Sequence, residues 1–292
     1  MSAHNTPATA GVPASSFVAP PAVNPPGGQR PPAEPRDIAW VWDLPFDRLT
    51  MDAAVDHLDR LIRRGQPSFA ITANLNYAML HHRDPAVAAA TADAAMVLAD
   101  GQPIVLRSRL TGSPLPQRVA GSELIYRLAA MAAANHHPIY FLGGNPGVAR
   151  RCADELTRRN PTLLVAGVES PPFRPLTPAE QAEQTERIRT SGAKILLVAL
   201  GQPKGELWVH QHYRSLGIPL SIQLGASFDF VTGDVTRAPD WCQKLGIEWL
   251  HRALSDPRRL APRYAANAFF LAGRLINDWQ SKVRRWGMNP NA

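Results

Sequence analysis

The chain has 292 residues, 45% of them hydrophobic, which is enough to bury a sizeable core as one large domain or two small ones. Its two cysteines, Cys152 and Cys242, form no CxxC or Cys/His metal spacing, which argues against a disulfide framework and favours a reducing cytoplasm. The net charge is +7, and from Arg237 onward ten Lys or Arg residues stand against four Asp or Glu residues, which favours an anionic partner.

The first 35 residues contain nine of the 28 prolines and few large apolar residues. We therefore expect residues 1–35 to form a disordered, partly polyproline II-like tail. The chain does not begin with a basic segment followed by an apolar core, so the sequence predicts no signal peptide. No stretch reaches the roughly 18 uncharged apolar residues that a membrane-spanning helix needs.

A β-α-β unit is predicted after this tail. Asp37–Trp42 is typical of a first strand, and Asp47–Arg64 is typical of an amphipathic helix that ends at Gly65. The apolar runs Phe69–Ile71 and Met96–Ala99 then predict two buried strands joined by a helix. Parallel strands end at the same edge of a sheet, and α/β proteins bind their ligands there.

Polar residues follow both of these strands. Thr72 and Asn74 come after the first strand, and Asp100 comes after the second, so we expect all three to face one crevice. An acid that ends a buried strand, beside a glycine such as Gly101, is a candidate catalytic base. A simpler interpretation also fits, in which Asp100-Gly101 is a turn and Thr72 or Asn74 caps a helix.

Arg118 lies just before a predicted helix, 124–135, for which Ser122 is a plausible N-cap. It could hold a phosphate there together with backbone N–H groups and the helix dipole, or it could form a surface ion pair. Glycines at 143–147 separate a predicted strand, 138–142, from a predicted helix, 148–159, and could cradle a diphosphate. The pattern is not GxGxxG, so a dinucleotide site rests only on the order strand, glycines, helix.

Two more strands end near charged residues. Lys194–Leu200 is followed by Lys204, a point charge suited to phosphate, and Ser221–Leu224 is followed by Asp229, an acid suited to ribose hydroxyls. With five or more β-α repeats, the sequence predicts an α/β fold over residues 36–241, with a mainly parallel, Rossmann-like sheet and helices on both faces. Residues 242–292 are predicted to form a helical, basic C-terminal appendage.

Several motifs in the right order resemble the WecG/TagA/CpsF family of bacterial glycosyltransferases over about Val41 to Ile276. The matching segments are Thr72-Ala73-Asn74, Ala99-Asp100-Gly101, Gln117–Gly121, Phe141–Gly144, Leu200–Lys204, Gly225–Phe230, Arg237–Trp241, Gly246–Arg252, Pro257-Arg258-Arg259 and Arg263-Tyr264. The resemblance implies a metal-independent, inverting transfer of a sugar from a UDP-sugar to a polyprenyl-diphosphate-linked saccharide, with no cofactor.

The resemblance also assigns residues. It implies that Asp100 is the catalytic base and that Thr72, Asn74 and Arg118 complete the catalytic pocket. The residues predicted to bind the nucleotide sugar are Gly143, Gly144, Gly167, Gln202, Lys204, Gly225 and Asp229. The chain has no Asp-x-Asp, so arginines and a lysine are the natural groups to meet the charge of the leaving UDP. No metal ligands are therefore expected.

One departure from the family concerns the segment after the strand predicted at Lys194–Leu200. The family usually reads Pro-Lys-Gln-Glu, whereas here Pro203-Lys204 is followed by Gly205-Glu206. The contact of that glutamine is then absent or comes from another residue, such as Gln202. This departure leaves the choice of donor sugar open.

The C-terminal appendage contains a predicted helix, 265–286, with Leu275 and Trp279 on one face and basic residues near its end. Such a face suits a helix lying on an anionic bilayer, but it also suits packing on the core or on another subunit. In the resembling family this appendage docks over the active site and supplies arginines. Arg252, Arg259 and Arg263 are the candidates for a phosphate or acceptor site.

Two other functions stay open on sequence alone: a Rossmann-type NAD(P)-binding oxidoreductase, and a non-catalytic membrane-associated scaffold of the same fold. Nucleic acid is not an expected partner, because the basic residues are interleaved with buried-type aromatics and no nucleic-acid motif is present. We expect a peripheral protein on the inner face of the cell membrane, in exopolysaccharide or other surface-glycan synthesis. The donor sugar, the acceptor glycan and the oligomeric state, including a homo-oligomer, stay open.

Overall fold

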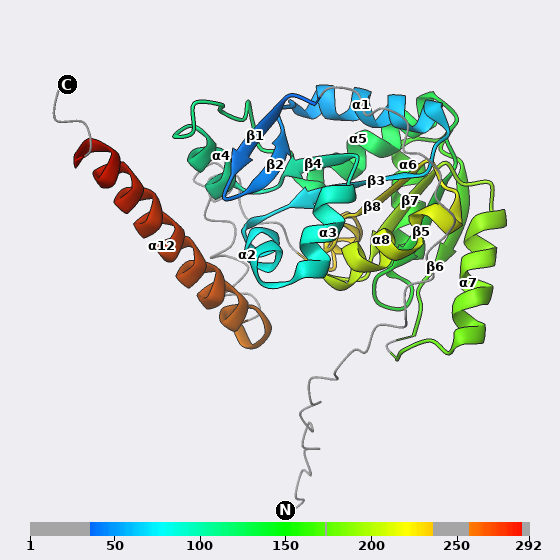
Figure 1. Ribbon diagram of the computed structural model, residues 1–292. Coiled ribbons are helices and arrows are strands. Elements are labelled where there is room, and N and C mark those ends of the chain that lie inside the picture. Colours follow the sequence, from blue (N-terminus) through cyan, green and yellow to red (C-terminus); the bar gives the residue numbers. More distant parts are fainter. Residues whose placement is uncertain (1–35, 173, 236–256, 288–292) are drawn as a thin grey trace, which may run out of the picture. The chain divides into compact units, whose positions relative to one another are not determined.

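The computed structural model describes residues 36–172, 174–235 and 257–287, and a six-stranded parallel sheet forms its centre (Figure 1). The strands run in the order β4-β3-β8-β7-β5-β6. Their bounds are β3 (Ser68–Ala73), β4 (Met96–Ala99), β5 (Ile139–Gly143), β6 (Val165–Glu169), β7 (Ile195–Ala199) and β8 (Leu220–Gln223). After β4 at one edge, the chain crosses to β5 on the other side of β3. The strand order therefore reverses beside β3 and β8, the position where α/β sheets bind ligands.

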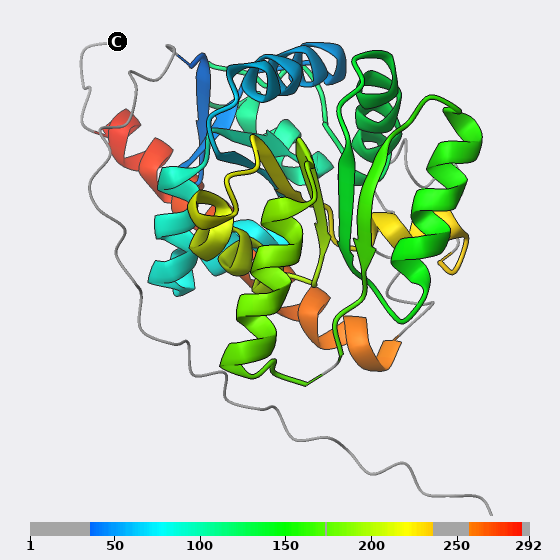
Figure 2. The ribbon, with the colours of Figure 1, turned by 90° about the vertical axis from the view of Figure 1, so that its right-hand side faces the viewer.

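Helices cover both faces of the sheet, as predicted (Figure 2). One face packs against α1 (Met51–Arg64), α5 (Gly121–Ala134), α6 (Val148–Arg159) and α9 (Ser227–Thr232). The other face packs against α2 (Leu75–Arg83), α3 (Pro85–Asp93), α4 (Gln102–Ser108), α7 (Pro178–Thr190) and α8 (Lys204–Leu216). Successive side chains of a strand alternate between these two apolar layers. This explains why β7 is apolar at every position from Ile195 to Ala199.

The predicted first strand belongs to a separate hairpin. β1 (Ile38–Val41) pairs antiparallel with β2 (Leu44–Asp47) and packs beside the main sheet. The prediction of a helix from Asp47 was wrong at its start, because the Asp47 carboxylate accepts a hydrogen bond from the Val97 backbone N–H at 2.7 Å. The helix begins at Met51 instead, after Thr50, whose hydroxyl accepts from the Ala53 N–H at 3.2 Å.

Further elements differ from the predictions. α5 begins at Gly121, so Ser122 lies inside its first turn and does not cap it. Residues Gln102–Ser108 form a helix, α4, for which no prediction was made, and Lys204 is the first residue of α8. The C-terminal helix α12 (Pro257–Gly287) is longer than predicted at both ends. Among the described residues, no helix has both the length and the apolar character needed to cross a bilayer.

The N-terminal tail, residues 1–35, lies outside the described residues, and so does the predicted junction between core and appendage at 241/242. These two boundaries remain predictions from the sequence.

Candidate active site

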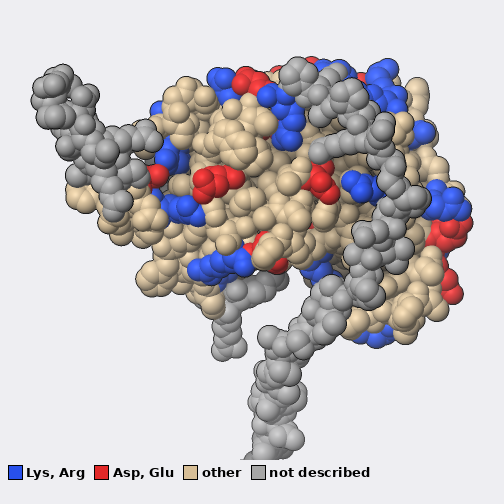
Figure 3. Space-filling model, in the orientation of Figure 1, with Lys and Arg blue, Asp and Glu red and all other residues tan. Residues whose placement is uncertain are grey.

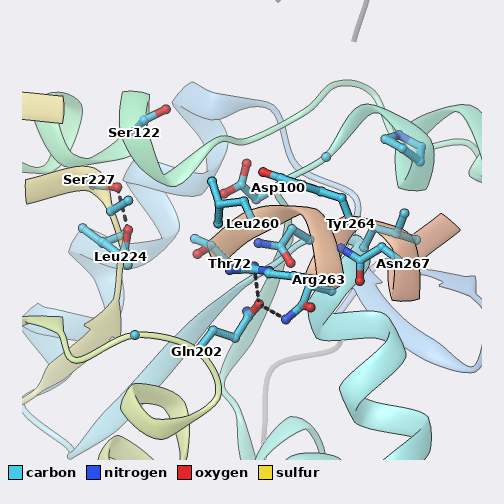
Figure 4. Close-up of a pocket in the computed structure, with 18 of the residues that line it drawn as sticks. Thr72, Asp100, Ser122, Gln202, Leu224, Ser227, Leu260, Arg263, Tyr264 and Asn267 are labelled. Carbon is cyan, nitrogen blue, oxygen red and sulfur yellow. Dashed lines mark hydrogen bonds between the residues drawn. The ribbon is translucent and has the colours of Figure 1, made fainter. Parts of the chain in front are cut away.

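A cavity of about 370 Å³ opens at the carboxyl ends of β3, β4, β7 and β8 (Figure 4). Thr72, Asn74, Asp100 and Arg118 all line it, so the structure brings together the four residues predicted to form the catalytic pocket. The parallel pairing of β3 with β4 explains why these residues lie close together, because Thr72 pairs with Leu98, two residues before Asp100. The volume falls within the range that is usual for small-molecule sites.

Asp100 is held between two elements. Its backbone N–H donates to the Ala73 carbonyl at 2.9 Å, which continues the pairing of β3 with β4. Its carboxylate Oδ2 accepts from the Gly121 N–H at 3.3 Å, at the first residue of α5. α5 has no side-chain cap of its own at Ala120, so Asp100 satisfies one N–H group at this helix end. The carboxylate is thus oriented by backbone on one wall of the cavity.

The simpler interpretations of two neighbours also hold in part. The Asn74 side chain caps α2, because its oxygen accepts from the Tyr77 N–H at 3.0 Å. Arg118 pairs with Glu123 at 2.9 Å while lining the cavity, with 21% of its side chain exposed. Both side chains are therefore fixed by the protein before any ligand is present.

Gln202 connects three helices beneath the cavity. Its Oε1 accepts from Asn76 Nδ2 of α2 at 2.8 Å and from Arg263 Nη2 of α12 at 3.1 Å. Its Nε2 donates to Glu206 Oε1 of α8 at 3.0 Å. Figure 4 shows Arg263 reaching from α12 to Gln202 at the strand ends. One carboxamide thereby joins the C-terminal helix to the floor of the site.

Glu206 is almost fully buried beside this carboxamide, and its second oxygen, Oε2, has no hydrogen-bond partner. Burial raises the pKa of Glu206 to about 7, against the opposing effects of the Gln202 hydrogen bond and the Arg263 charge. Glu206 is thus a second acid on the cavity, beside Asp100, and it lies on the wall formed by α8.

α12 closes one side of the cavity with Leu260, Arg263, Tyr264, Asn267, Ala268 and Leu271. The helix is attached to the core by a bidentate pair, in which Arg107 of α4 donates to both Asp278 oxygens at 2.5 and 2.7 Å. Phe270 stacks edge-on against Trp42, with 6.0 Å between ring centroids. Of the three predicted appendage arginines, Arg263 reaches the cavity. Arg252 and the side chain of Arg259 lie outside the described part of the chain.

The seven residues predicted to bind the nucleotide sugar divide into two groups. Gln202 and Gly225 line the cavity. Five do not line it: Gly143, Gly144, Gly167, Lys204 and Asp229.

Packing explains two of these glycines. A Cβ at Gly143 would lie 2.5 Å from the Ala199 carbonyl oxygen, and a Cβ at Gly167 would lie 2.3 Å from the Tyr140 ring. Asp229 belongs to α9, which packs against α6. Burial, and after it the charge of Asp229, raises the pKa of Cys152 in α6 to about 12. Their nucleotide-binding roles remain predictions.

Eight polar residues that line the cavity were not among the predicted site residues: Asn76, Gln102, Ser122, Glu206, Gln223, Ser227, Tyr264 and Asn267. Asn76 and Glu206 lie close to predicted site residues, two positions after Asn74 and Lys204 respectively. Asn267 could have been predicted from the sequence, because it lies four residues after Arg263 and four before Leu271, and such spacing places the three on one face of a helix.

The fold and this site define a class of protein: a Rossmann-like α/β enzyme whose acid-bearing cavity lies at the carboxyl edge of a parallel sheet. The family model described as "Glycosyl transferase WecG/TagA/CpsF family" matches residues 39–285. The chain belongs to that family and is a glycosyltransferase. The oxidoreductase and scaffold alternatives are therefore wrong.

A relative in Bacillus spizizenii is similar over 217 residues, at 28% identity. The match covers 74% of this chain and 82% of the relative. That protein is an N-acetylglucosaminyldiphosphoundecaprenol N-acetyl-beta-D-mannosaminyltransferase.

Proposed function

We propose that this glycosyltransferase moves a sugar from a UDP-sugar to a saccharide linked to a polyprenyl diphosphate, with inversion at the anomeric carbon. The observation that carries the proposal is the position of Asp100, a carboxylate held by backbone in a cavity that also contains Arg118 and Arg263. An acid and two guanidinium groups in one cavity suit a reaction that moves a proton at one end and releases a diphosphate at the other.

In this reaction the acceptor hydroxyl attacks the anomeric carbon while the Asp100 carboxylate takes its proton. The new bond joins the acceptor oxygen to the anomeric carbon. The bond from that carbon to the UDP oxygen breaks, and UDP leaves with the electron pair. A single displacement from the opposite face inverts the configuration, so one base is enough and no second nucleophile is required.

We further propose that cationic side chains meet the charge of the leaving UDP without a divalent metal ion. Arg118 and Arg263 line the cavity from opposite elements, the loop before α5 and the C-terminal helix. Guanidinium groups bind phosphate oxygens through paired N–H donors, and such fixed donors stabilise charge that develops in a transition state. The absence of Asp-x-Asp from the sequence supports the same proposal.

The acceptor is proposed from the relative, whose name specifies N-acetylglucosamine on undecaprenyl diphosphate. We propose the same chemical class here: a saccharide on a polyprenyl diphosphate, used in the synthesis of an exopolysaccharide or another surface glycan. Identity of 28% does not carry the sugar specificity of the relative, so the donor is to be chosen by experiment among UDP-sugars.

We propose that the enzyme works as a peripheral protein on an anionic membrane, at the inner face where such a lipid acceptor is presented. Four large apolar residues of α12 support this: Phe269, Leu275, Ile276 and Trp279 are between 48% and 78% exposed. Figure 3 shows uncharged residues over much of the described part of α12. An exposed apolar helix face with Trp suits the bilayer interface.

The test of this function is incubation of the full chain with a panel of UDP-sugars and a short-chain polyprenyl-diphosphate-linked saccharide, followed by product mass. We expect one donor to extend the acceptor by a single sugar, also in the presence of a chelator. Extension by none of the UDP-sugars would contradict the proposal, and loss of transfer with chelator would contradict its metal-free part.

A further inference from the structure

Gly205 and Gln223 share one buried space beside the cavity. Gly205 lies in the first turn of α8 with ordinary helical geometry, so its backbone does not require glycine. A Cβ built on Gly205 would lie 2.3, 2.4 and 2.6 Å from the Cδ, Oε1 and Nε2 atoms of Gln223. The Gln223 carboxamide thus occupies the space that a side chain at position 205 would need.

Gln223 is the last residue of β8, is 4% exposed and lines the cavity. Oriented to satisfy its neighbours, its carboxamide nitrogen donates to the Val198 carbonyl at 2.7 Å, and its oxygen accepts from the Gly201 N–H at 3.1 Å. It therefore bridges the end of β7 to the loop residue directly before Gln202. Its backbone carbonyl also accepts from the Thr72 hydroxyl at 3.4 Å.

The loop that contains Gly201 matters for the site because its next residue, Gln202, accepts hydrogen bonds from Asn76 and Arg263 and donates one to Glu206. If Gly201 is released, Gln202 can shift, and Arg263 loses a fixed partner. The buried Val198 carbonyl would also lose the carboxamide as a donor. The glutamine contact that Gly205 cannot make was predicted to be absent or to come from another residue, such as Gln202. The structure places the Gln223 carboxamide in the space beside Gly205.

We infer that Gln223 is a positioning residue for nucleotide-sugar binding, and that Gly205 is glycine in order to admit its carboxamide. Gln223 and Gly205 affect UDP-sugar binding indirectly, by fixing the positions of Gly201 and Gln202. The inference rests on the proposed function, because it assigns the effect to the UDP-sugar side of that reaction.

The test is a double-mutant cycle on the full chain, with the KM for the UDP-sugar as the readout. Gln223→Ala removes the carboxamide, and Gly205→Ala displaces it, so each should raise the KM about tenfold. Because both changes remove the same interaction, the double variant Gly205→Ala/Gln223→Ala should raise the KM by no more than the larger single effect. The exchange variant Gly205→Gln/Gln223→Gly returns a carboxamide to this space from α8 and should recover most of the wild-type KM.

The KM separates positioning from a loss of folded protein, because unfolding a fraction of the enzyme lowers the apparent kcat and leaves the KM unchanged. Gln181→Ala, on the exposed side of α7, is the matched control and should leave the KM unchanged. Unchanged KM in both single variants, or effects that multiply in the double variant, would overturn the inference alone. A wild-type chain that transfers no sugar would overturn the proposed function and this inference with it.

Discussion

Glu206 illustrates at the scale of one residue how burial controls charge in this site. Burial raises the pKa of Glu206 from 4.5 to about 7, so the folded protein favours the neutral acid. A group whose pKa is raised on folding contributes stability that is complete below its unfolded pKa and is lost as the pH rises through its folded pKa. Glu206 should therefore stabilise the fold at pH 4.5 relative to pH 8.

We predict that the unfolding free energy of the wild type, measured relative to Glu206→Gln, falls by roughly 3 kcal/mol between pH 4.5 and pH 8. The glutamine cannot ionise but keeps an oxygen for the Gln202 amide. Urea unfolding of both proteins at several pH values measures the difference. A difference that is constant with pH, or one that grows as the pH rises, would be incompatible with the raised pKa.

Arg263 is the described cation that reaches the cavity from α12, and it donates to Gln202. We predict that Arg263→Ala lowers kcat about 10²–10³-fold, because a fixed donor to the developing diphosphate charge is lost. The kcat of Arg263→Lys should lie between those of the wild type and Arg263→Ala, because lysine keeps the charge but lacks the planar N–H donors. Arg158→Ala, on the exposed surface of α6 with 71% of its side chain exposed, is the matched control. Equal kcat for Arg263→Ala and this control would exclude a catalytic role for Arg263.

At the scale of elements, α12 is held at one end by Arg107 and Asp278 and at the other by contacts of Leu260 and Arg263 with the site. We predict that Asp278→Ala speeds hydrogen exchange in α12 and lowers transfer several-fold, because the largely buried Arg107 then loses this carboxylate partner. The reversed pair, Arg107→Asp with Asp278→Arg, should partly restore both the slow hydrogen exchange in α12 and the rate of transfer. If exchange in α12 is unchanged in Asp278→Ala, the pair does not hold the helix.

The sequence predicted the sheet well because its signals are local. Buried strands of four to six residues, each followed by a polar turn, can be recognised from the local sequence alone, and they correctly placed Thr72, Asn74 and Asp100 at one edge of the sheet. The family resemblance, not the strand pattern, indicated that Arg118 lies in the same pocket. The predicted ends of elements were wrong where a residue distant in the sequence determines them. Asp47 joins β2 because the Val97 N–H, 50 residues away, binds its carboxylate.

The rest of the site depends on contacts that no local pattern shows. Gln202 meets Asn76 across 126 residues and Arg263 across 61 residues. A Cβ at Gly205 would lie only 2.3 Å from the Gln223 carboxamide, a close approach between a helix and a strand that are separate in the sequence. Family resemblance indicated the glycine but could not indicate which side chain fills its space.

At the scale of the whole molecule, the exposed apolar residues of α12 face away from the contacts that attach the helix to the core. We predict that the full chain sediments with anionic vesicles, and that Phe269→Ala/Trp279→Ala weakens this binding at least tenfold. Leu164→Ala, at a residue with 45% exposure, is the control for losing an exposed apolar side chain elsewhere. Unaltered vesicle binding, with a change in oligomeric state instead, would assign this face to a second copy of the chain.

The central claim is that the Asp100 carboxylate takes the proton of the acceptor hydroxyl. Single-turnover transfer by Asp100→Asn, with the donor that the wild type uses, tests it most directly. Asparagine can still accept from the Gly121 N–H, so the variant should fold with wild-type stability, and transfer should slow about 10²–10⁴-fold. A folded Asp100→Asn protein that transfers sugar at the wild-type rate would contradict the account.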